Sequence, residues 1–585
     1  MRTITCFIGL IGVLSALGDH ATAATPMTFY RATDLSTLGG DEMWSSGLAI
    51  NSQGHVAGLS DIPPNTGYHA FLYSDGVMQD LGTLGGNESR AYGINDNDEV
   101  VGWSDLTGTY PDSDHAFLYS QGVMTDIGTL GSDQSLAWGI NNSGQVVGSA
   151  AWHIAFSYSN GVMTDLGSLG APNNSQAAAT AINSSGQIVG LSSVGNTARM
   201  HAFLYSNGVM TDLTPGANIL NSQATAITDN GRIVGTVQAA VQGAQQHAAI
   251  FSGGGVVDLG TLGGYESIAT GVNSSGQLVG YSDIATTSGV QHAFASNGGA
   301  ITDLNDLTAI NSHPTADWYV YKAAGINDAG QIVATLRSPG SVESPGEKYH
   351  AAVLNPVAGV TTSVAIDPSQ SGLTLSADIN GFPFIEQTPG SLTSALAGSL
   401  TVDLIGSPGA WTDIRFHSAN PIQAVGHAGP FQPGNGPADL ASFVSLDNDG
   451  EPLLASLASR NTILDASSGF LSIGPDGGVS LDGLLSTLTT TIDYDLPGII
   501  SGSGGAHASG PIGGRGSVVQ VGNTLYITIP IDLSFTTQPP ELGGGATFNY
   551  RYTGQIVATA TVPEPSTFAL AGLAILGLPR LLRRH

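Results

Sequence analysis

The stretch GINNSGQVVG at residues 139–148, followed by HIAFSYSNGVMTDLGSLG at 153–170, decides the fold because both halves recur along the chain. The first half returns as GINDNDEVVG at 93–102, and the second as HAFLYSQGVMTDIGTLG at 115–131. The histidine that opens the second half recurs at spacings of 46, 38, 48, 46 and 45 residues, at His69, His115, His153, His201, His247 and His292. A repeat of about 46 residues is typical of propeller blades.

Each repeat predicts four short strands, joined in pairs by an Asn-x-x-Gly turn and a Ser-Asn/Asp-Gly turn. The chain begins with half a repeat, FYRATDLSTLGG at 29–40, and the repeats end with the complementary half, HAAVLN at 350–355. Pairing of the two halves would complete a blade and cover both sheet edges. We therefore predict an all-β fold with a seven-bladed β-propeller over 28–356. An open β-solenoid is the alternative.

These motifs resemble the extracellular HAF-repeat family, named after the His-Ala-Phe triplet that begins the second half of the repeat. The resemblance covers residues 28–356, with three submotifs in a fixed order. It implies an exported protein and supports the propeller, but it implies no particular chemistry.

The composition argues against some functions, and the N-terminal sequence predicts export. The 585 residues include 15 Lys and Arg against 45 Asp and Glu, a formal charge of −30, which argues against binding to nucleic acid. Residues 1–23 read as a signal peptide, with an apolar run from Cys6 to Leu17 and small residues at Ala21 and Ala23 for cleavage. Cys6 is the single cysteine, so we expect no disulfide, thiol chemistry or cysteine-ligated metal in the mature chain.

The C-terminal segment 561–585 resembles the PEP-CTERM sorting signal. Its motif is Pro563, Glu564 and Pro565, followed by an apolar stretch and by Arg580, Arg583 and Arg584. The resemblance implies processing by an exosortase and export to the cell surface or its exopolysaccharide, with a transient stage in the inner membrane. The uninterrupted apolar stretch 567–578 predicts a short helix of roughly 18 Å, less than the roughly 30 Å of a bilayer core. An uncleaved tail that anchors the protein in the membrane is the alternative.

Between the repeats and the tail, the sequence predicts a linker and a second domain. Small and polar residues over 357–372 indicate the linker, and strand-like runs such as 399–406 and 526–535 indicate a β-sandwich-like domain over 373–560.

Alternating strand directions would place all the tight turns of the propeller on one face and the variable connections on the other. The aromatic residues predicted in or beside those connections are Trp44, Tyr68, Tyr110, Trp152, Trp318 and Tyr319, and aspartates such as Asp61 and Asp105 accompany them. Flat rings beside carboxylates suit sugars, so we predict a ligand face for extracellular polysaccharide. The alternative is that these rings cap the blade cores.

No residue is predicted to be catalytic or to bind a metal. A residue needed once for chemistry would not recur in every blade, so the repeated histidines are expected to form hydrogen bonds within the blades, and the repeated asparagines to stabilise turns. The turns Asn95–Glu99 and 447–450 partly resemble calcium loops, which leaves calcium as a weak alternative to the absence of a cofactor.

The sequence thus predicts a secreted or cell-surface protein with a structural or binding role, processed by an exosortase, and not an enzyme. The alternatives are a propeller enzyme that acts on polysaccharide and a periplasmic scaffold held by an uncleaved tail.

Overall fold

The computed structural model describes residues 25–562 with internal gaps, and these residues form two compact units. One unit is Thr28–Val357, and the described residues from Ala358 onward belong to the other. The gaps are 41–42, 64–66, 107–113, 152, 171–175, 196, 217, 242, 285–289, 311–317, 339–346, 367, 380–381, 387–392, 408–409, 418–421, 426–439, 447–451, 469–470, 482–483, 497–499, 512–514, 522 and 538–547.

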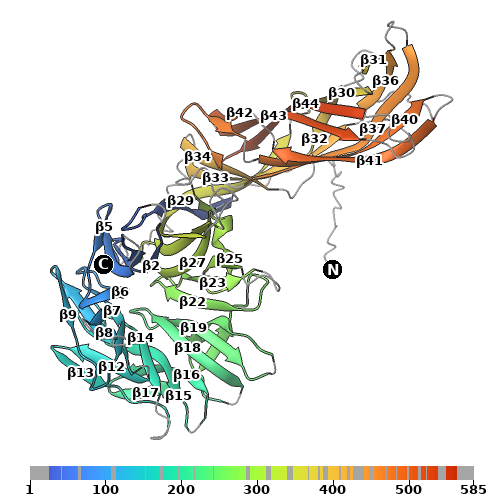
Figure 1. The fold of residues 1–585 in the computed structure, drawn as a ribbon. Coiled ribbons are helices and arrows are strands. Elements are labelled where there is room, and N and C mark those ends of the chain that lie inside the picture. Colours follow the sequence, from blue (N-terminus) through green and yellow to red (C-terminus); the bar gives the residue numbers. More distant parts are fainter. Residues whose placement is uncertain are drawn as a thin grey trace, which may run out of the picture. The chain divides into compact units, whose positions relative to one another are not determined.

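The unit Thr28–Val357 contains six four-stranded antiparallel sheets, the blades, which follow one another in chain order (Figure 1). The first three are β2 (Ser45–Ile50), β3 (Val56–Asp61), β4 (Tyr68–Ser74) and β5 (Val77–Asp80); β6 (Gly85–Ile94), β7 (Val100–Leu106), β8 (Asp114–Ser120) and β9 (Val123–Asp126); and β10 (Ser135–Ile140), β11 (Val146–Ala150), β12 (Ile154–Ser159) and β13 (Val162–Asp165). The next three are β14 (Ala177–Ile182), β15 (Ile188–Ser193), β16 (Met200–Ser206) and β17 (Val209–Asp212); β18 (Ile219–Ile227), β19 (Ile233–Ala239), β20 (His247–Ser252) and β21 (Gly255–Asp258); and β22 (Ser267–Val272), β23 (Leu278–Asp283), β24 (Gln291–Ser296) and β25 (Thr302–Asp303). The all-β prediction and the propeller are confirmed.

The predicted count of seven blades is wrong, because six four-stranded sheets are seen. The remaining repeat strands are β27 (Tyr319–Ile326), β28 (Ile332–Ser338) and the start of β29 (Lys348–Ile366), which pair in series. β29 also pairs with β1 (Thr25–Asp34), so the two half-repeats do meet. These strands do not form a separate sheet because β29 continues past the repeat and joins them to a 20-stranded network.

A short connection precedes β27 in the same unit. It contains the 3-10 helix η1 (Leu304–Asp306) and β26 (Thr308–Ala309), which pairs in parallel with β1. η1 is the only helix among the described residues.

The two predicted turns have the expected backbone. In the outer hairpins both central residues have positive φ, as at Asp75 (50°) and Gly76 (81°), which is the type I′ geometry that suits the twist of paired strands. In the Asn-x-x-Gly turns the glycine has positive φ, as at Gly144 (74°), and Asp98 (58°) takes the same conformation where the sequence has no glycine.

The glycine that ends the "VVG" motif is required by close packing. A Cβ atom on Gly148 would lie 2.0 Å from the backbone oxygen of Leu136 and 2.7 Å from the ring of Phe156. The same close contact joins Gly58 to Phe71, Gly190 to Phe203 and Gly280 to Phe294. The repeated phenylalanines are fully buried, at Phe71, Phe117, Phe156, Phe203 and Phe294.

Buried serines link most neighbouring blades, and Ala177 stands at the same position in the fourth blade. The Ala116 amide in β8 donates to Ser135 Oγ at 2.9 Å, and that hydroxyl donates to the Gly128 carbonyl at 2.6 Å. Ser89 makes the same two contacts with the Ala70 amide and the Gly82 carbonyl, and Ser267 makes them with the Ala248 amide and the Gly260 carbonyl. The link across β1 and β29 follows this pattern, because the Ala351 amide donates to Ser45 Oγ at 2.9 Å.

The repeated histidines bind the repeated aspartates across the outer hairpin, as expected of a structural role. Histidine Nδ1 lies 2.6–3.0 Å from the carboxylate in the pairs His69–Asp80, His115–Asp126, His201–Asp212, His247–Asp258, His292–Asp303 and His350–Asp34. Burial alone would raise the pKa of Asp303, but hydrogen bonds from His292 and Asn305 outweigh it and hold the pKa below its usual value. His153 lies 12 residues before Asp165 instead of 11, and its exposed side chain has no such partner in the structure described.

The second unit packs its strands around one core that includes Val402, Ile414, Ile529 and Tyr552. Its strands are β30 (Gly372–Ile379), β31 (Phe382–Glu386), β32 (Thr393–Ala397), β33 (Ser399–Ser407), β34 (Ala410–His417), β35 (Ile422–Val425), β36 (Leu440–Leu446), β37 (Pro452–Ser468), β38 (Leu471–Ser472), β39 (Gly478–Ser480), β40 (Leu484–Leu496), β41 (Ile500–Pro511), β42 (Arg515–Val521), β43 (Thr524–Thr537) and β44 (Phe548–Thr561). They pair as one continuous hydrogen-bonded network, and the sandwich-like arrangement stays a prediction.

The segment predicted as a linker, 357–372, is mostly strand. β29 runs to Ile366, and Val360, Thr362, Val364 and Ile366 are buried at alternate positions against β33. Small β-branched residues that suggest a flexible joint serve equally well in a strand with one buried face.

The predicted C-terminal helix has no support. Across the part of the chain that the structure describes, no helix is long and apolar enough to cross a membrane. The tail from Pro563 onward, with Arg580, Arg583 and Arg584, lies outside the described residues, as do Ala21 and Ala23 of the signal peptide.

The histidine–aspartate pairs predict a specific loss of stability. His201→Ala should lower the free energy of unfolding by about 2 kcal/mol, since a hydrogen bond to a charged group contributes roughly 1.5–3 kcal/mol and the His201 side chain is only 4% exposed. His153→Ala is the matched control and should change it by less than about 0.5 kcal/mol. Urea unfolding followed by tryptophan fluorescence measures both. Equal effects of the two substitutions would contradict a stabilising role for the pair.

Candidate functional site

Asparagine side chains join the turns between the first and second strands of successive repeats, with one exception at Thr228. Nδ2 of Asn141 donates to the Asn183 carbonyl of the next blade at 3.1 Å, and Asn51, Asn95, Asn183 and Asn273 make the same contact with the turn that follows each. Asn327 returns to the Asn51 carbonyl at 2.9 Å, across 276 residues of sequence. We call these six side chains the asparagine belt, and the end of the blades that carries it the turn face.

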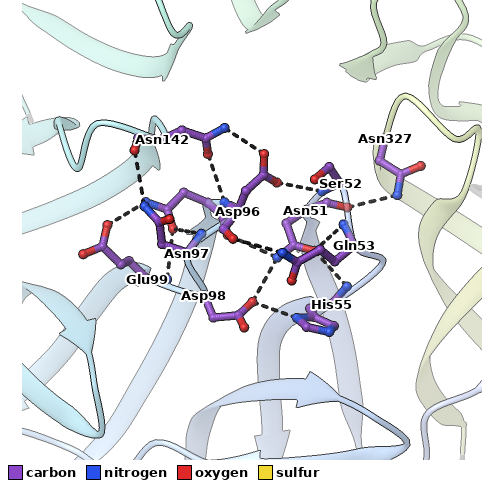
Figure 2. A network of polar contacts seen from close by, with 11 residues as sticks. Asn51, Ser52, Gln53, His55, Asp96, Asn97, Asp98, Glu99, Asn142 and Asn327 are labelled. Atoms are coloured by element: carbon purple, nitrogen blue, oxygen red, sulfur yellow. Dashed lines mark hydrogen bonds and ion pairs between the residues drawn. The ribbon is translucent and has the colours of Figure 1, made fainter.

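Figure 2 shows the belt where Asn327, Asn51 and the turn Asn95–Glu99 meet. Asp96 accepts from the Ser52 amide at 2.9 Å and from Asn142 Nδ2 at 2.7 Å, and Asp98 accepts from His55 Nδ1 at 2.7 Å. Burial alone would raise the pKa of Asp96, but the hydrogen bonds from Ser52 and Asn142 outweigh it and lower the pKa.

The turn Asn95–Glu99 does not have the structure of a calcium loop. Asp96 and Asp98 accept hydrogen bonds from the neighbouring turn, and Glu99 accepts one from Asn95 Nδ2 of its own turn at 2.7 Å. Among the described residues no group of histidine, cysteine and acidic side chains is placed to hold a metal. The second calcium-like turn, 447–450, lies outside them.

One turn departs from the asparagine belt. Thr228 stands where the other turns have asparagine, and no bond reaches from its side chain to the Asn273 carbonyl. Arg232 makes the inter-blade contact instead, with Nη1 3.0 Å from the Gly276 oxygen. A hollow of about 610 Å³ lies here, lined by residues that include Arg232, Gly254 and Ser275.

The opposite end of the blades, the loop face, carries the variable connections because every strand pair within a blade is antiparallel. Two clusters of aromatic rings around cations lie here. In the Arg90 cluster, the guanidinium is 5.0 Å from the ring of Tyr68, 6.0 Å from Tyr92 and 5.9 Å from Trp103. Tyr92 continues the cluster, since its ring lies 4.4 Å from that of Trp138.

The Lys322 cluster comprises Lys322, Arg337, Tyr281, Tyr319, Tyr321 and Tyr349. Lys322 Nζ is 4.3 Å from the ring of Tyr281 and 4.9 Å from that of Tyr321. Arg337 lies 5.3–5.9 Å from the rings of Tyr319, Tyr321 and Tyr349 and forms an ion pair with Glu347. Such contacts are attractive because the face of an aromatic ring is electron-rich.

Burial perturbs the ionisation of both clusters. It lowers the pKa of Lys322, an effect that the charge of Asp283 partly offsets. It raises the pKa of Tyr349 to about 12, and the hydrogen bond from that hydroxyl to Glu347 adds to the shift. Burial would lower the pKa of Arg90, but contacts with Tyr92 and Tyr68 outweigh it and raise the pKa.

The structure brings together some of the predicted ligand-face residues. Tyr319 belongs to the Lys322 cluster and accepts a 2.8 Å hydrogen bond from Arg337, and Trp44 adjoins the cluster, with its ring 6.4 Å from that of Tyr349. Tyr68 belongs to the Arg90 cluster. Trp318 packs on the ring of His350 at 4.8 Å and against a blade core, which fits the alternative prediction of a cap. Tyr110 and Trp152 lie outside the described residues.

Sequence reasoning missed Arg90, Lys322, Arg337, Trp103 and Tyr349. The available signal was departure from the repeat. Arg90 and Lys322 both stand five residues before the turn asparagine, where the other repeats have Ser46, Leu136, Ala178, Gln223 and Ile268.

Two segments of the chain match known protein families. Residues 172–374, about a third of the chain, match a family described as a protein of unknown function, DUF3466. Residues 561–584 match the PEP-CTERM protein-sorting motif. No curated protein matches the chain. The sorting motif indicates an exported cell-surface protein that is processed by an exosortase. The HAF repeats have no match of their own and stay a prediction.

The break in the asparagine belt predicts a stabilising substitution. Thr228→Asn, combined with Arg232→Gln to reproduce the common turn, should restore the contact with the Asn273 carbonyl. We expect a gain of about 1 kcal/mol in the free energy of unfolding, the net contribution of one buried hydrogen bond. Asn141→Thr, the reverse exchange, should lower it by at least as much. Urea unfolding measures both, and a destabilised T228N/R232Q variant would show that the belt does not carry this energy.

Proposed function

We propose that the exported protein binds an extracellular polysaccharide through the aromatic rings of its loop face. The observation that carries the proposal is the concentration of rings in adjacent blades, from Tyr281 through Tyr319, Tyr321 and Tyr349 to Trp44. Tyrosine and tryptophan offer large, rigid contact areas at a low cost in conformational entropy, and they are enriched where binding energy is concentrated.

The position of the rings within the repeat supports binding. Tyr68, Trp152 and Tyr349 each precede the repeated histidine, and the same position holds Asp114, Met200, Gln246 and Gln291 in the other repeats. A ring needed to close a blade core would be present in every repeat. Rings that occur in only some repeats instead vary as binding residues do, and Tyr68 and Tyr349 stand in neighbouring repeats of the circle.

The proposal assigns the protein a binding role and not a catalytic one. The histidine–aspartate pairs recur from blade to blade and act as cross-strand contacts. In the second unit Asp403 is bound by Arg415, His417 and Thr361, and the threonine hydroxyl donates to the carboxylate at 2.6 Å. A catalytic nucleophile needs a base such as histidine as its own hydrogen-bond partner, whereas His417 is bound to the carboxylate of Asp403.

Retention on purified matrix polysaccharide tests the binding role. The W44A/Y349A variant should bind at least about tenfold more weakly, because loss of a central aromatic contact costs about 2 kcal/mol or more. R232Q on the turn face should bind like the parent. Circular dichroism and thermal melting establish that each variant is folded. Equal retention of folded W44A/Y349A and the parent would contradict the proposal.

Processing at the sorting motif gives a second test. We expect protein recovered from the cell surface to lack the residues after the Pro563–Pro565 motif, and intact-mass spectrometry reads the mature C-terminus directly. A variant with all three motif residues changed to alanine should keep its tail and remain with the membrane fraction. Surface protein that retains 566–585 would favour a scaffold anchored by its tail.

A further inference from the structure

We propose that the loop face selects acidic sugars, with Arg90 and Lys322 as the groups that hold the carboxylate of a uronate residue. This inference rests on the proposed polysaccharide binding and names the class of ligand.

Among the residues that the structure describes, Arg90 and Lys322 form no ion pair with a carboxylate. The chain has 15 Lys and Arg against 45 Asp and Glu, so each cation has many potential partners. Arg337 pairs with Glu347, whereas no ion pair of Arg90 or Lys322 is present among the described side chains. The buried Nε of Arg90 also has no hydrogen-bond acceptor there. A buried donor without an acceptor is costly unless a ligand supplies one.

The two cations occupy equivalent positions on either side of one inner strand. Arg90 lies in β6 and Lys322 in β27, each five residues before the asparagine of its turn, and β2 lies between these strands. β2 presents the small residue Ser46 at the same position, whose hydroxyl is 2.7 Å from that of Thr335. A polymer that crosses this sector would therefore meet two cations flanking a small polar residue.

Among the described residues, the acidic groups near Arg90 and Lys322 form no ion pair with either cation. Asp283 acts on Lys322 without an ion pair, and Glu88 is a partner of Tyr68 beside Arg90. The other carboxylates of the chain are screened over about 8–10 Å at physiological ionic strength, whereas a half-buried cation in contact with a ligand is screened much less. The net charge of −30 therefore does not prevent a local anion site.

The chemistry around each cation matches a sugar acid better than a free anion. Rings of Tyr68 and Trp103 beside Arg90, and of Tyr281 and Tyr321 beside Lys322, offer flat apolar surface for a pyranose ring. The guanidinium offers paired donors that suit a carboxylate, and the ammonium offers a compact charge. A neutral sugar would use the rings and leave both cations unpaired.

The test compares polygalacturonate, alginate and hyaluronan with their fully methyl-esterified forms, in buffer with a chelator, by isothermal titration calorimetry on the full mature chain. We expect at least one free acid to bind tenfold or more tightly than its ester. R90Q/K322Q installs the residue that Gln223 provides at the same repeat position, so it should fold, lose this preference and keep its affinity for the ester. R232Q removes a cation from the turn face and should behave like the parent.

Equal affinity of the parent for every acid and its ester, or an unchanged preference in folded R90Q/K322Q, would overturn the inference. Retention of the parent on matrix polysaccharide in either case would leave the proposed function standing. Loss of that retention as well would reject both.

Discussion

The hydrogen bond from each turn asparagine to the carbonyl of the next turn is the contact on which the propeller depends. A single four-stranded blade buries its phenylalanine and valine side chains only against a neighbouring blade, so no blade is stable alone. The Asn327–Asn51 bond and the pairing of β1 with β29 join the first repeat to the last, which turns a chain of nearest-neighbour contacts into a closed circle. The same repeat residues that specify a blade therefore also specify its neighbours.

The repeats can differ more at the loop face than at the turn face. At the turn face the asparagine amide, its own turn and the next blade form one set of bonds, and a change there disturbs two blades at once. At the loop face the inner strands begin, and the residue five places before the asparagine varies from Ser46 to Arg90 to Leu136. Binding residues can accumulate on that face without loss of the circle, because a rigid scaffold holds the variable connections.

The sequence predicted the features that are local and repeated. Tight turns, hydrogen bonds of the repeated histidines within the blades and the meeting of the half-repeats follow from periods and turn residues that occur several times in the chain, whereas the structure identifies the aspartate partners. Features that occur once were harder to predict. The separate seventh blade was predicted wrongly because β29 runs on through VAGVTTSVAI. This stretch is compatible with either a joint or a strand, and pairing with β33 makes it a strand as far as Ile366. Arg90 and Lys322 are single residues whose importance depends on rings from neighbouring strands, which no spacing within the sequence reveals.

The distribution of charge follows from the same architecture. The outermost strands β5, β9, β13, β17 and β21 have four residues each, and β5 ends at Asp80, whose side chain is 45% exposed and bound to His69. Short edge strands that carry a charge resist pairing with other chains, a hazard for any propeller because every blade has an outer edge. Val77, Val123, Val162 and Val209 are more than 60% exposed on these strands, and a charged residue beside such a valine disfavours pairing of the edge with another chain. Acidity at the rim thus serves the fold, and it leaves the rare cations of the inner strands as the groups best placed to distinguish one ligand from another.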